Sequence, residues 1–298
     1  MGNVRYEEVQ CRQALNRVEG MGFRWSLNPY RGCVHGCQYC FARRYHGFLE
    51  LNASEDFTGI IFVKVNCPDA LRQELSRPSW RGDAVAVGTA TDPYQPIEGR
   101  YGLTRRCLEV LALKRTPVSL VTKGTMIVRD SDVLTEAARR AGSTVCFSVT
   151  TLDPELWRSL EPGTPPPLKR LQAMGQLVRA GVKAGVLLAP VIPGITDGRD
   201  NLEAVVRAAA EQGACFLGAN VLHLKPGTRE HFMGFLNSDY PGLLPAYQRL
   251  YPGSYTPKQF QETLQGQVQT LKRQHHLGER PSPVIQPEER PRQLPLGV

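Results

Sequence analysis

The sequence predicts an α/β fold, a partial (β/α)6 TIM-like barrel that is followed by a C-terminal helical extension. Short apolar runs rich in β-branched residues alternate along the chain with segments of helical periodicity. Strands that are apolar throughout are typical of a parallel sheet covered by helices. Six or seven such units are too few for a closed eightfold barrel, which favours an open one. A doubly wound sheet is the alternative on pattern alone.

Each expected strand is a short apolar run, and several expected helices begin or end at a recognisable signal. The strands are expected at residues 24–28, 60–65, 84–87, 118–122, 144–150, 185–189 and 216–224. The helices between them are expected at residues 37–51, 68–77, 103–114, 131–141, 165–180 and 200–212. Pro68 stands at the start of its helix, Ser131 suits an N-cap, and Gly181 is a helix stop signal.

The pattern divides the chain into an N-terminal extension, the barrel, a helical extension and a flexible Pro-rich tail. These four segments are residues 1–23, 24–225, 226–279 and 280–298. Amphipathic helices are expected in the third segment at 243–250 and 259–274. The last segment contains five prolines and little apolar content, which is typical of a flexible tail.

The charge balance is compatible with a polyanionic partner such as nucleic acid. Thirty-six Lys and Arg against 28 Asp and Glu give a net charge of +8. No apolar stretch approaches the roughly 18 residues that a membrane span needs. The first dozen residues are charged and lack an apolar core, so no secretory signal is visible and a cytoplasmic protein without a membrane partner is expected.

Three of the eight cysteines, Cys33, Cys37 and Cys40, are close enough in sequence to hold one metal centre. A structural zinc site normally closes with four ligands, and the fourth would be His35, strained inside the loop, or His46. Ordinary [4Fe–4S] clusters also take four thiolates, and no nearby cysteine completes the set. Three thiolates without an obvious fourth ligand suggest a cluster with one open iron, where substrate or cosubstrate can bind.

The C-x3-C-x2-C spacing, with Tyr39 before the last cysteine, resembles the signature of the radical S-adenosylmethionine enzymes. The resemblance implies a [4Fe–4S] cluster on the three cysteines, whose open iron chelates the amino and carboxylate groups of S-adenosylmethionine. An electron from the cluster would split the sulfonium and release a 5′-deoxyadenosyl radical that abstracts hydrogen. It also implies a reducing partner such as flavodoxin or ferredoxin, and a partial barrel is the fold of this superfamily.

Polar residues follow the expected strands, at the edge where parallel barrels collect their chemistry. Lys123 comes directly after the strand at 118–122, where a lone lysine needs an anionic partner. Asp92 lies in the loop after the strand at 84–87, and its position suggests a contact with the cosubstrate. Tyr39, Asp92, Lys123 and Ser148 are the candidate cofactor-binding residues.

Several of these runs resemble the spore photoproduct lyase branch of the superfamily, over about residues 28–195. The matching residues are Thr122-Lys123, Phe147-Ser148, Glu161-Pro-Gly-Thr164, Pro167, Arg170, Ala180-Gly181 and Ala189-Pro190. The resemblance implies that Lys123 and Ser148 contact the ribose and amino-acid parts of S-adenosylmethionine. The runs at 28–32 and 91–95 look more like an uncharacterised subgroup within this branch.

Two departures argue against photolesion repair. The lyase has a hydrogen-relay tyrosine after the last cluster cysteine, where this chain has Phe41, which carries no O–H group. Cys67 is the only cysteine in the interval of the lyase's hydrogen donor, and its spacing is shorter. Cys146 is a candidate hydrogen donor instead, because it shares a strand face with Ser148. The alternative is that Cys146 only packs in the core, as a small apolar residue would.

These observations together predict a radical S-adenosylmethionine enzyme that abstracts hydrogen, with nucleic acid as the leading substrate class. One alternative is a maturase or activating enzyme that acts on a peptide or protein. A second alternative is a non-enzymatic, metal-stabilised nucleic-acid-binding protein. The colour of the protein separates the zinc form of this last alternative from the others, since zinc sites are colourless and iron–sulfur clusters are brown.

Overall fold

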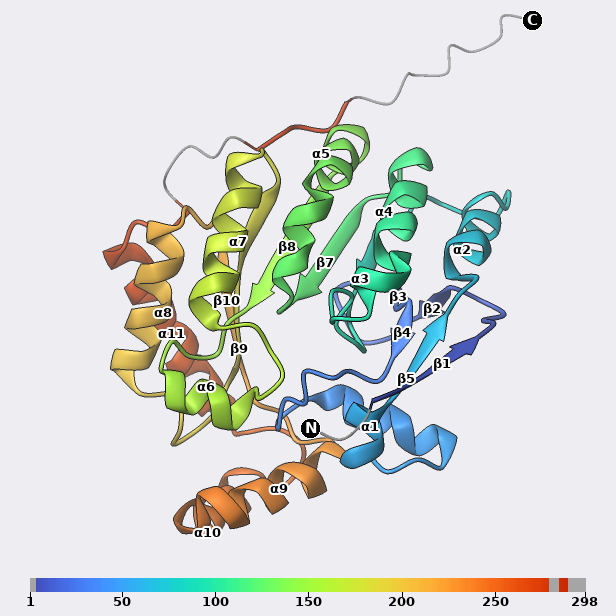
Figure 1. The fold of residues 1–298 in the computed structure, drawn as a ribbon. Coiled ribbons are helices and arrows are strands. Elements are labelled where there is room, and N and C mark those ends of the chain that lie inside the picture. The colour runs from blue at the N-terminus through green and yellow to red at the C-terminus, as the bar shows by residue number, and fades with distance from the viewer. Residues whose placement is uncertain (1–3, 279–283, 289–298) are drawn as a thin grey trace, which may run out of the picture.

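The computed structural model describes residues 4–278 and 284–288, and a seven-stranded sheet forms its centre (Figure 1). The strand order is β10-β9-β8-β7-β6-β3-β2. The strands are β2 (Leu15–Arg17), β3 (Trp25–Leu27), β6 (Val85–Val87), β7 (Val118–Thr122), β8 (Ser143–Ser148), β9 (Lys183–Val191) and β10 (Leu217–Val221). All neighbours pair in parallel except β2, which runs antiparallel to β3 at the edge. The six parallel strands confirm the predicted partial barrel.

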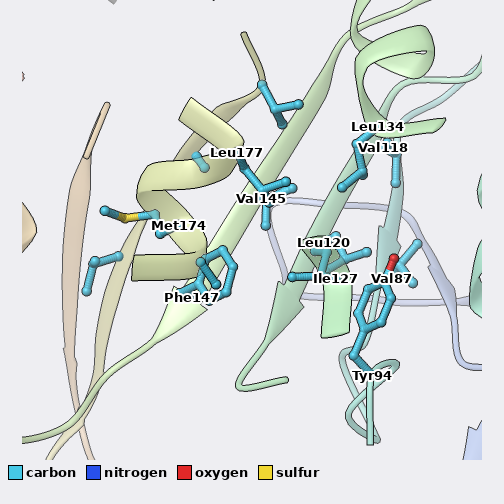
Figure 2. Packing of buried hydrophobic residues seen from close by; sticks show 14 of the residues in the cluster. Val87, Tyr94, Val118, Leu120, Ile127, Leu134, Val145, Phe147, Met174 and Leu177 are labelled. Carbon is cyan, nitrogen blue, oxygen red and sulfur yellow. The ribbon is translucent and has the colours of Figure 1, made fainter. Parts of the chain in front are cut away.

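Helices that lie between the parallel strands in sequence cover one face of this sheet (Figure 1). They are α2 (Cys67–Leu75), α4 (Leu103–Leu113), α5 (Ser131–Arg140), α7 (Pro167–Arg179) and α8 (Arg199–Glu211), and the C-terminal α11 (Lys258–Gln274) packs beside α8. These bounds agree with the predicted helices to within two residues. Figure 2 shows the core between sheet and helices, where Val145 and Phe147 of β8 meet Leu177 of α7. Alternate strand positions therefore face the helices, and the positions between them face the concave side.

The predicted strand at 60–65 forms, but it is not a barrel strand. It is β5 (Ile60–Lys64), which pairs in parallel with β1 (Arg5–Val9) and antiparallel with β4 (Tyr30–Arg31) in a separate three-stranded sheet. Ile61 and Val63 of β5 are buried in a small separate core, and Phe62 between them is half-buried. An apolar run specifies a strand, but its neighbours in the sheet depend on contacts that are distant in sequence.

The helix expected at 37–51 is shorter and of a different type. It is the 3-10 helix η1 (Phe41–Leu49), and Cys37 to Cys40 lie in turns before it. The backbone N–H of Cys40 donates to the carbonyl of Cys37 at 3.3 Å, and Gly36 has a φ of +65°. The left-handed conformation at Gly36 breaks the helical path, so the three cysteines project from a loop.

The C-terminal part contains one long helix that the sequence pattern missed, α9 (Thr228–Asp239). The helix expected at 243–250 is the 3-10 turn η3 (Pro241–Leu243) with α10 (Leu244–Leu250), and α11 matches the one expected at 259–274. Four further short helices are α1 (Glu55–Gly59), α3 (Glu98–Tyr101), η2 (Thr125–Asp130) and α6 (Pro154–Leu160).

Part of the segment expected to be a flexible tail contacts the barrel. The backbone N–H of Ile285 donates to the carbonyl of Gly181 at 2.9 Å, and that of Glu288 donates to Arg139 at 2.7 Å. The rest of 280–298 lies outside the described residues. Within the described part of the chain, no helix combines the length and apolar character that crossing a membrane requires.

Candidate metal and cofactor site

The three motif cysteines lie in one buried loop between β4 and η1, beside the carboxyl ends of the parallel strands. Cys33 and Cys37 are buried, and Cys40 is half-buried. Burial raises the pKa of Cys37 and Cys40 above that of a free thiol, and the positive charge of Lys123 opposes this effect at both. The negative charges of Cys33 and Cys40 also raise the pKa of Cys37, and that of Cys33 raises the pKa of Cys40, so the three thiols are electrostatic neighbours. Thiolates gathered here need positive charge or a metal centre to stabilise them.

Arg43 supplies a buried positive charge at this loop. Its guanidinium donates to the carbonyl oxygens of Gly36 at 2.9 Å and Cys37 at 3.1 Å, and to those of Ala53 and Ser54 at 3.0 Å each. It pairs with no carboxylate among the described residues. Three thiols beside an uncompensated buried cation fit a centre with net negative charge, such as a thiolate-ligated cluster.

A buried ion pair supports the loop from the barrel side. Tyr39 donates its hydroxyl hydrogen to the carboxylate of Glu161, and a Glu161 oxygen lies 2.5 Å from Nη2 of Arg170. Burial alone would raise the pKa of Glu161, but the charges of Arg170 and Lys123 lower it below its usual value. Glu161 and Arg170 belong to the motif that the sequence analysis singled out, and the structure joins that motif to the cluster loop.

Gly163 brings the backbone of this motif directly against the backbone of the cluster loop. Its backbone N–H donates to the carbonyl of His35 at 3.0 Å. A Cβ atom at this position would lie 2.2 Å from the carbonyl oxygen of Val34. Only glycine therefore allows the two chain segments to approach this closely.

Lys123 directly follows β7 and lies beside the cysteine loop, and its contact with the cosubstrate stays a prediction. Its Nζ is 5.5 Å from the centroid of the Tyr39 ring. Burial lowers the pKa of Lys123, but the negative charges of Cys37 and Glu161 outweigh this effect and raise it overall. The lysine is thus held protonated next to the loop, where it can attract an anionic group of a bound molecule.

Asp92 connects the loop after β6 with both the cysteine loop and the end of β7. Its carboxylate accepts from Thr122 Oγ1 at 2.7 Å, the N–H of Lys123 at 2.6 Å and the N–H of Tyr94 at 2.9 Å. Nδ1 of His35 lies 3.3 Å from it. Burial raises the pKa of Asp92, but these partners outweigh it and hold the pKa well below its usual value. Direct contact of Asp92 with the cosubstrate stays a prediction, and in the structure its oxygens position two loops.

Ser148 and Cys146 share the concave face of β8. Ser148 donates its hydroxyl hydrogen to the carbonyl of Ala189 at 3.0 Å. Cys146 is buried but belongs to none of the apolar clusters, while its neighbours Val145 and Phe147 lie in the main core. Burial raises the pKa of Cys146 to about 11, so it is a neutral thiol with an S–H group. Its role as hydrogen donor stays a prediction.

The two other residues that bear on hydrogen return, Cys67 and Phe41, lie in different surroundings. Cys67 is fully buried in the main core, with its Sγ 3.9 Å from that of Cys107. It therefore packs in a different cluster of buried residues from Cys33 and Cys37. Phe41 directly follows Cys40 and is partly exposed, at 38%.

Sequence reasoning missed two residues that hold the loop. Gln95 is fully buried, donates to the carbonyl of Gly32 at 3.1 Å and accepts from the N–H of Val34 at 3.2 Å. Its place in the polar run after the strand at 84–87 was the available signal. Arg43 carried no signal, because a basic residue in a polar helix normally lies on the surface.

Comparison with known proteins agrees with this geometry. The family model of the radical SAM superfamily matches residues 27–208. Uncharacterised proteins of Mycobacterium tuberculosis and Mycobacterium bovis are 41% identical over 286 residues, covering 94% of this chain and 84% of theirs. A protein of Pseudomonas phage M6, named radical SAM Nalpha-GlyT isomerase, is 28% identical over 183 residues, covering 61% of this chain and 36% of that protein.

Among solved structures, spore photoproduct lyase with bound AdoMet and dinucleoside spore photoproduct has a similar fold. Its TM-score is 0.71 at 15% identity, and the match covers 91% of this chain and 79% of the lyase. At this identity the likeness concerns the fold alone. Since the family model covers more than half of the chain, this protein belongs to the radical SAM superfamily, whose enzymes use a [4Fe–4S] cluster and S-adenosylmethionine.

Proposed function

We propose that this radical SAM enzyme modifies a nucleic acid, with its cluster held by Cys33, Cys37 and Cys40. When bound, the cluster and S-adenosylmethionine supply a carbon-centred radical that abstracts a hydrogen atom from the substrate. The observation that carries the cluster assignment is the grouping of three thiols, two buried and one half-buried, beside the cations Lys123 and Arg43. The family requires a reductant, for which we propose a flavodoxin or ferredoxin.

The residues that surround the loop are suited to orient a zwitterionic cosubstrate. Lys123 presents a protonated amine to a carboxylate group, and Ser148 lies on the same concave side of the sheet. Hydrogen bonds to Glu161 and Thr150 fix the hydroxyl of Tyr39, so its ring has a defined position beside the loop. The buried setting excludes water, which strengthens each of these polar contacts.

The choice of nucleic acid rests on charge and on the comparisons. The net charge of +8 favours a polyanion. The lyase of similar fold binds a dinucleoside photoproduct, which makes a nucleic-acid substrate the first class to test. Phe41 cannot relay hydrogen through an O–H group, so we expect little or no thymine photolesion reversal and a different modification.

The cluster assignment is tested by anaerobic reconstitution. The wild type is expected to bind about four irons and to show a change in the EPR spectrum of its reduced state when S-adenosylmethionine is added. Cys33→Ala should abolish this response, whereas Cys215→Ala, outside the loop, should retain it. A full, cosubstrate-responsive cluster in Cys33→Ala would refute the assignment, and a colourless zinc-containing protein would favour the non-enzymatic alternative.

The substrate class is tested separately by binding and by product analysis. Affinity for DNA or RNA should fall steeply with salt, because each neutralised phosphate releases counterions. Single-stranded or distorted substrates should be preferred, since a base within a duplex must first be flipped out. Mass spectrometry of nucleosides after turnover identifies the modification. Absence of binding to every nucleic acid would favour the peptide or protein alternative.

A further inference from the structure

Five aromatic rings form a continuous row on the protein beside the cysteine loop. In order they are Phe48, Tyr45, Phe41, His223 and Tyr255, which we call the ring row. The successive ring centroids are 6.0, 6.3, 6.1 and 5.8 Å apart. We propose that the ring row is a stacking site for the bases of a single-stranded nucleic acid. This inference rests on the proposed substrate class and assigns the surface that binds it.

Three of the five rings in the ring row are exposed to an unusual degree for aromatic residues. The exposed fractions are 69% for Phe48, 55% for Tyr255 and 38% for Phe41. The described part of the chain has eight large exposed hydrophobic residues, and four of them are these three and Leu49, which follows Phe48. Contiguous exposed apolar surface in a monomeric protein is typical of a binding site. Every base has an apolar face, so a row of exposed rings accepts successive bases with little sequence preference.

The position of the ring row relates it to the site already described. Phe41 directly follows Cys40, and His223 lies just beyond the carboxyl end of β10. The hydroxyl of Thr228 donates to the carbonyl of Cys40 at 3.4 Å, which connects the start of α9 with the cysteine loop. A strand bound along the ring row would therefore pass the cysteine loop, where one nucleotide could enter.

The two halves of the ring row are packed against each other through backbone contacts. A Cβ atom on Gly227 would lie 3.1 Å from Cα of Arg44, so the chain after His223 packs closely on η1. Arg229 donates to the carbonyls of Tyr251 at 3.0 Å and Gly253 at 2.8 Å. This contact holds the loop that carries Tyr255. The rings are thus presented by a packed surface, which lowers the entropy cost of binding.

Positive charge lies within the ring row. The guanidinium carbon of Arg44 is 5.7 Å from the centroid of the Tyr45 ring, and Lys225 follows His223 by two residues. Neither cation forms an ion pair with Asp or Glu within residues 4–278 and 284–288. Burial and Lys225 lower the pKa of His223, so its ring is neutral at pH 7 and stacks as an aromatic group. Rings beside unpaired cations match the bases and phosphates of a single strand.

Binding of two labelled oligonucleotides to the anaerobically reconstituted protein tests this inference. One is a single strand of about 12 nucleotides, within the usual site size of such proteins, and the other is an abasic strand of equal length and charge. Tyr255→Ala and Phe48→Ala should each weaken binding of the first strand by roughly 5- to 100-fold. Both variants should bind the abasic strand like the wild type, because its phosphates can still reach Arg44 and Lys225, and it has no bases to stack.

Two further variants provide the controls. Tyr255→Trp keeps a stacking ring and should restore wild-type affinity, which a merely destabilised loop would not do. Tyr6→Ala removes an exposed ring of β1, 36% exposed, and should leave binding unchanged because it lies outside the ring row. The iron content and the melting temperature of all four variants, Tyr255→Ala, Phe48→Ala, Tyr255→Trp and Tyr6→Ala, should match those of the wild type.

The outcomes separate this inference from the proposed function. If the wild type binds the strand, but Tyr255→Ala and Phe48→Ala bind as tightly as Tyr6→Ala, the ring row is not the binding site and the substrate class stands. Equal affinity of the wild type for the base-containing and abasic strands would also overturn the stacking role. If the wild type binds no oligonucleotide, both proposals fail.

Discussion

Gly163 is the position at which a single methyl group should damage the metal site most directly. The Cβ atom of an alanine there would lie 2.2 Å from the carbonyl oxygen of Val34 and 3.0 Å from two atoms of His35. Relieving the first contact to 3.0 Å requires the two segments to separate by about 0.8 Å. Both neighbours are backbone between Cys33 and Cys37, so no side chain can simply rotate away. The movement must displace the cysteines themselves.

The energetic cost follows from the same contacts. Forcing extra volume into a packed region costs about 1–3 kcal/mol. Losing the hydrogen bond from Gly163 to His35, 3.0 Å long, adds about 1 kcal/mol. We therefore expect Gly163→Ala to lower the free energy of unfolding by about 2–4 kcal/mol. It should also reduce the iron bound after reconstitution, because three ligands at altered spacing no longer fit one cluster.

Denaturant unfolding of the apoprotein measures the first effect, and iron analysis with EPR of the reconstituted protein measures the second. Gly266→Ala is the matched control, since nothing lies within 4 Å of a Cβ on this residue of α11. That change should be neutral or should stabilise the protein by up to about 1 kcal/mol. Wild-type stability and full iron content in Gly163→Ala would refute the close packing described for this motif.

Three other predictions concern the charged and polar residues around the loop. Lys123→Ala and Ser148→Ala should keep the cluster but weaken S-adenosylmethionine binding by about 1–3 kcal/mol each, measured by equilibrium binding. Wild-type affinity in both variants would show that residues at other strand ends bind S-adenosylmethionine. Arg43→Met should lower the cluster's reduction potential and its iron occupancy, because a buried cation beside the thiols is lost; an unchanged potential in EPR-monitored titration would refute this role. Because the folded protein lowers the pKa of Glu161, the ionised carboxylate stabilises the fold above the usual pKa of 4.5, and this stabilisation is lost as the pH falls through the folded value. Glu161→Gln should therefore make the free energy of unfolding fall less steeply at acid pH, and an unchanged dependence on pH would contradict the prediction.

The sequence by itself determined the features that depend on local spacing. The cysteines at 33, 37 and 40 are close together in any fold because so few residues separate them in sequence, so their spacing alone predicted a shared metal centre. The alternation of residues along a strand also predicted that Cys146 and Ser148 share one face of their strand. In the structure the residues between and before them, Phe147 and Val145, lie in the main core, and Cys146 and Ser148 do not. The alternation of residues in strands and the periodicity of helices are local patterns, so most strands and helices of the barrel could be predicted from the sequence.

Only the tertiary structure decided which distant residues meet. Nothing local indicated that β5 would leave the barrel for a second sheet, because an apolar strand is compatible with either neighbour. The buried position of Arg43 was equally hidden, since its partners are carbonyl oxygens, which every residue carries. The contact of Gly163 with His35 joins residues more than a hundred positions apart. Burial and long-range hydrogen bonding arise from the packing of the whole chain, so neither is encoded in the periodicity of one segment.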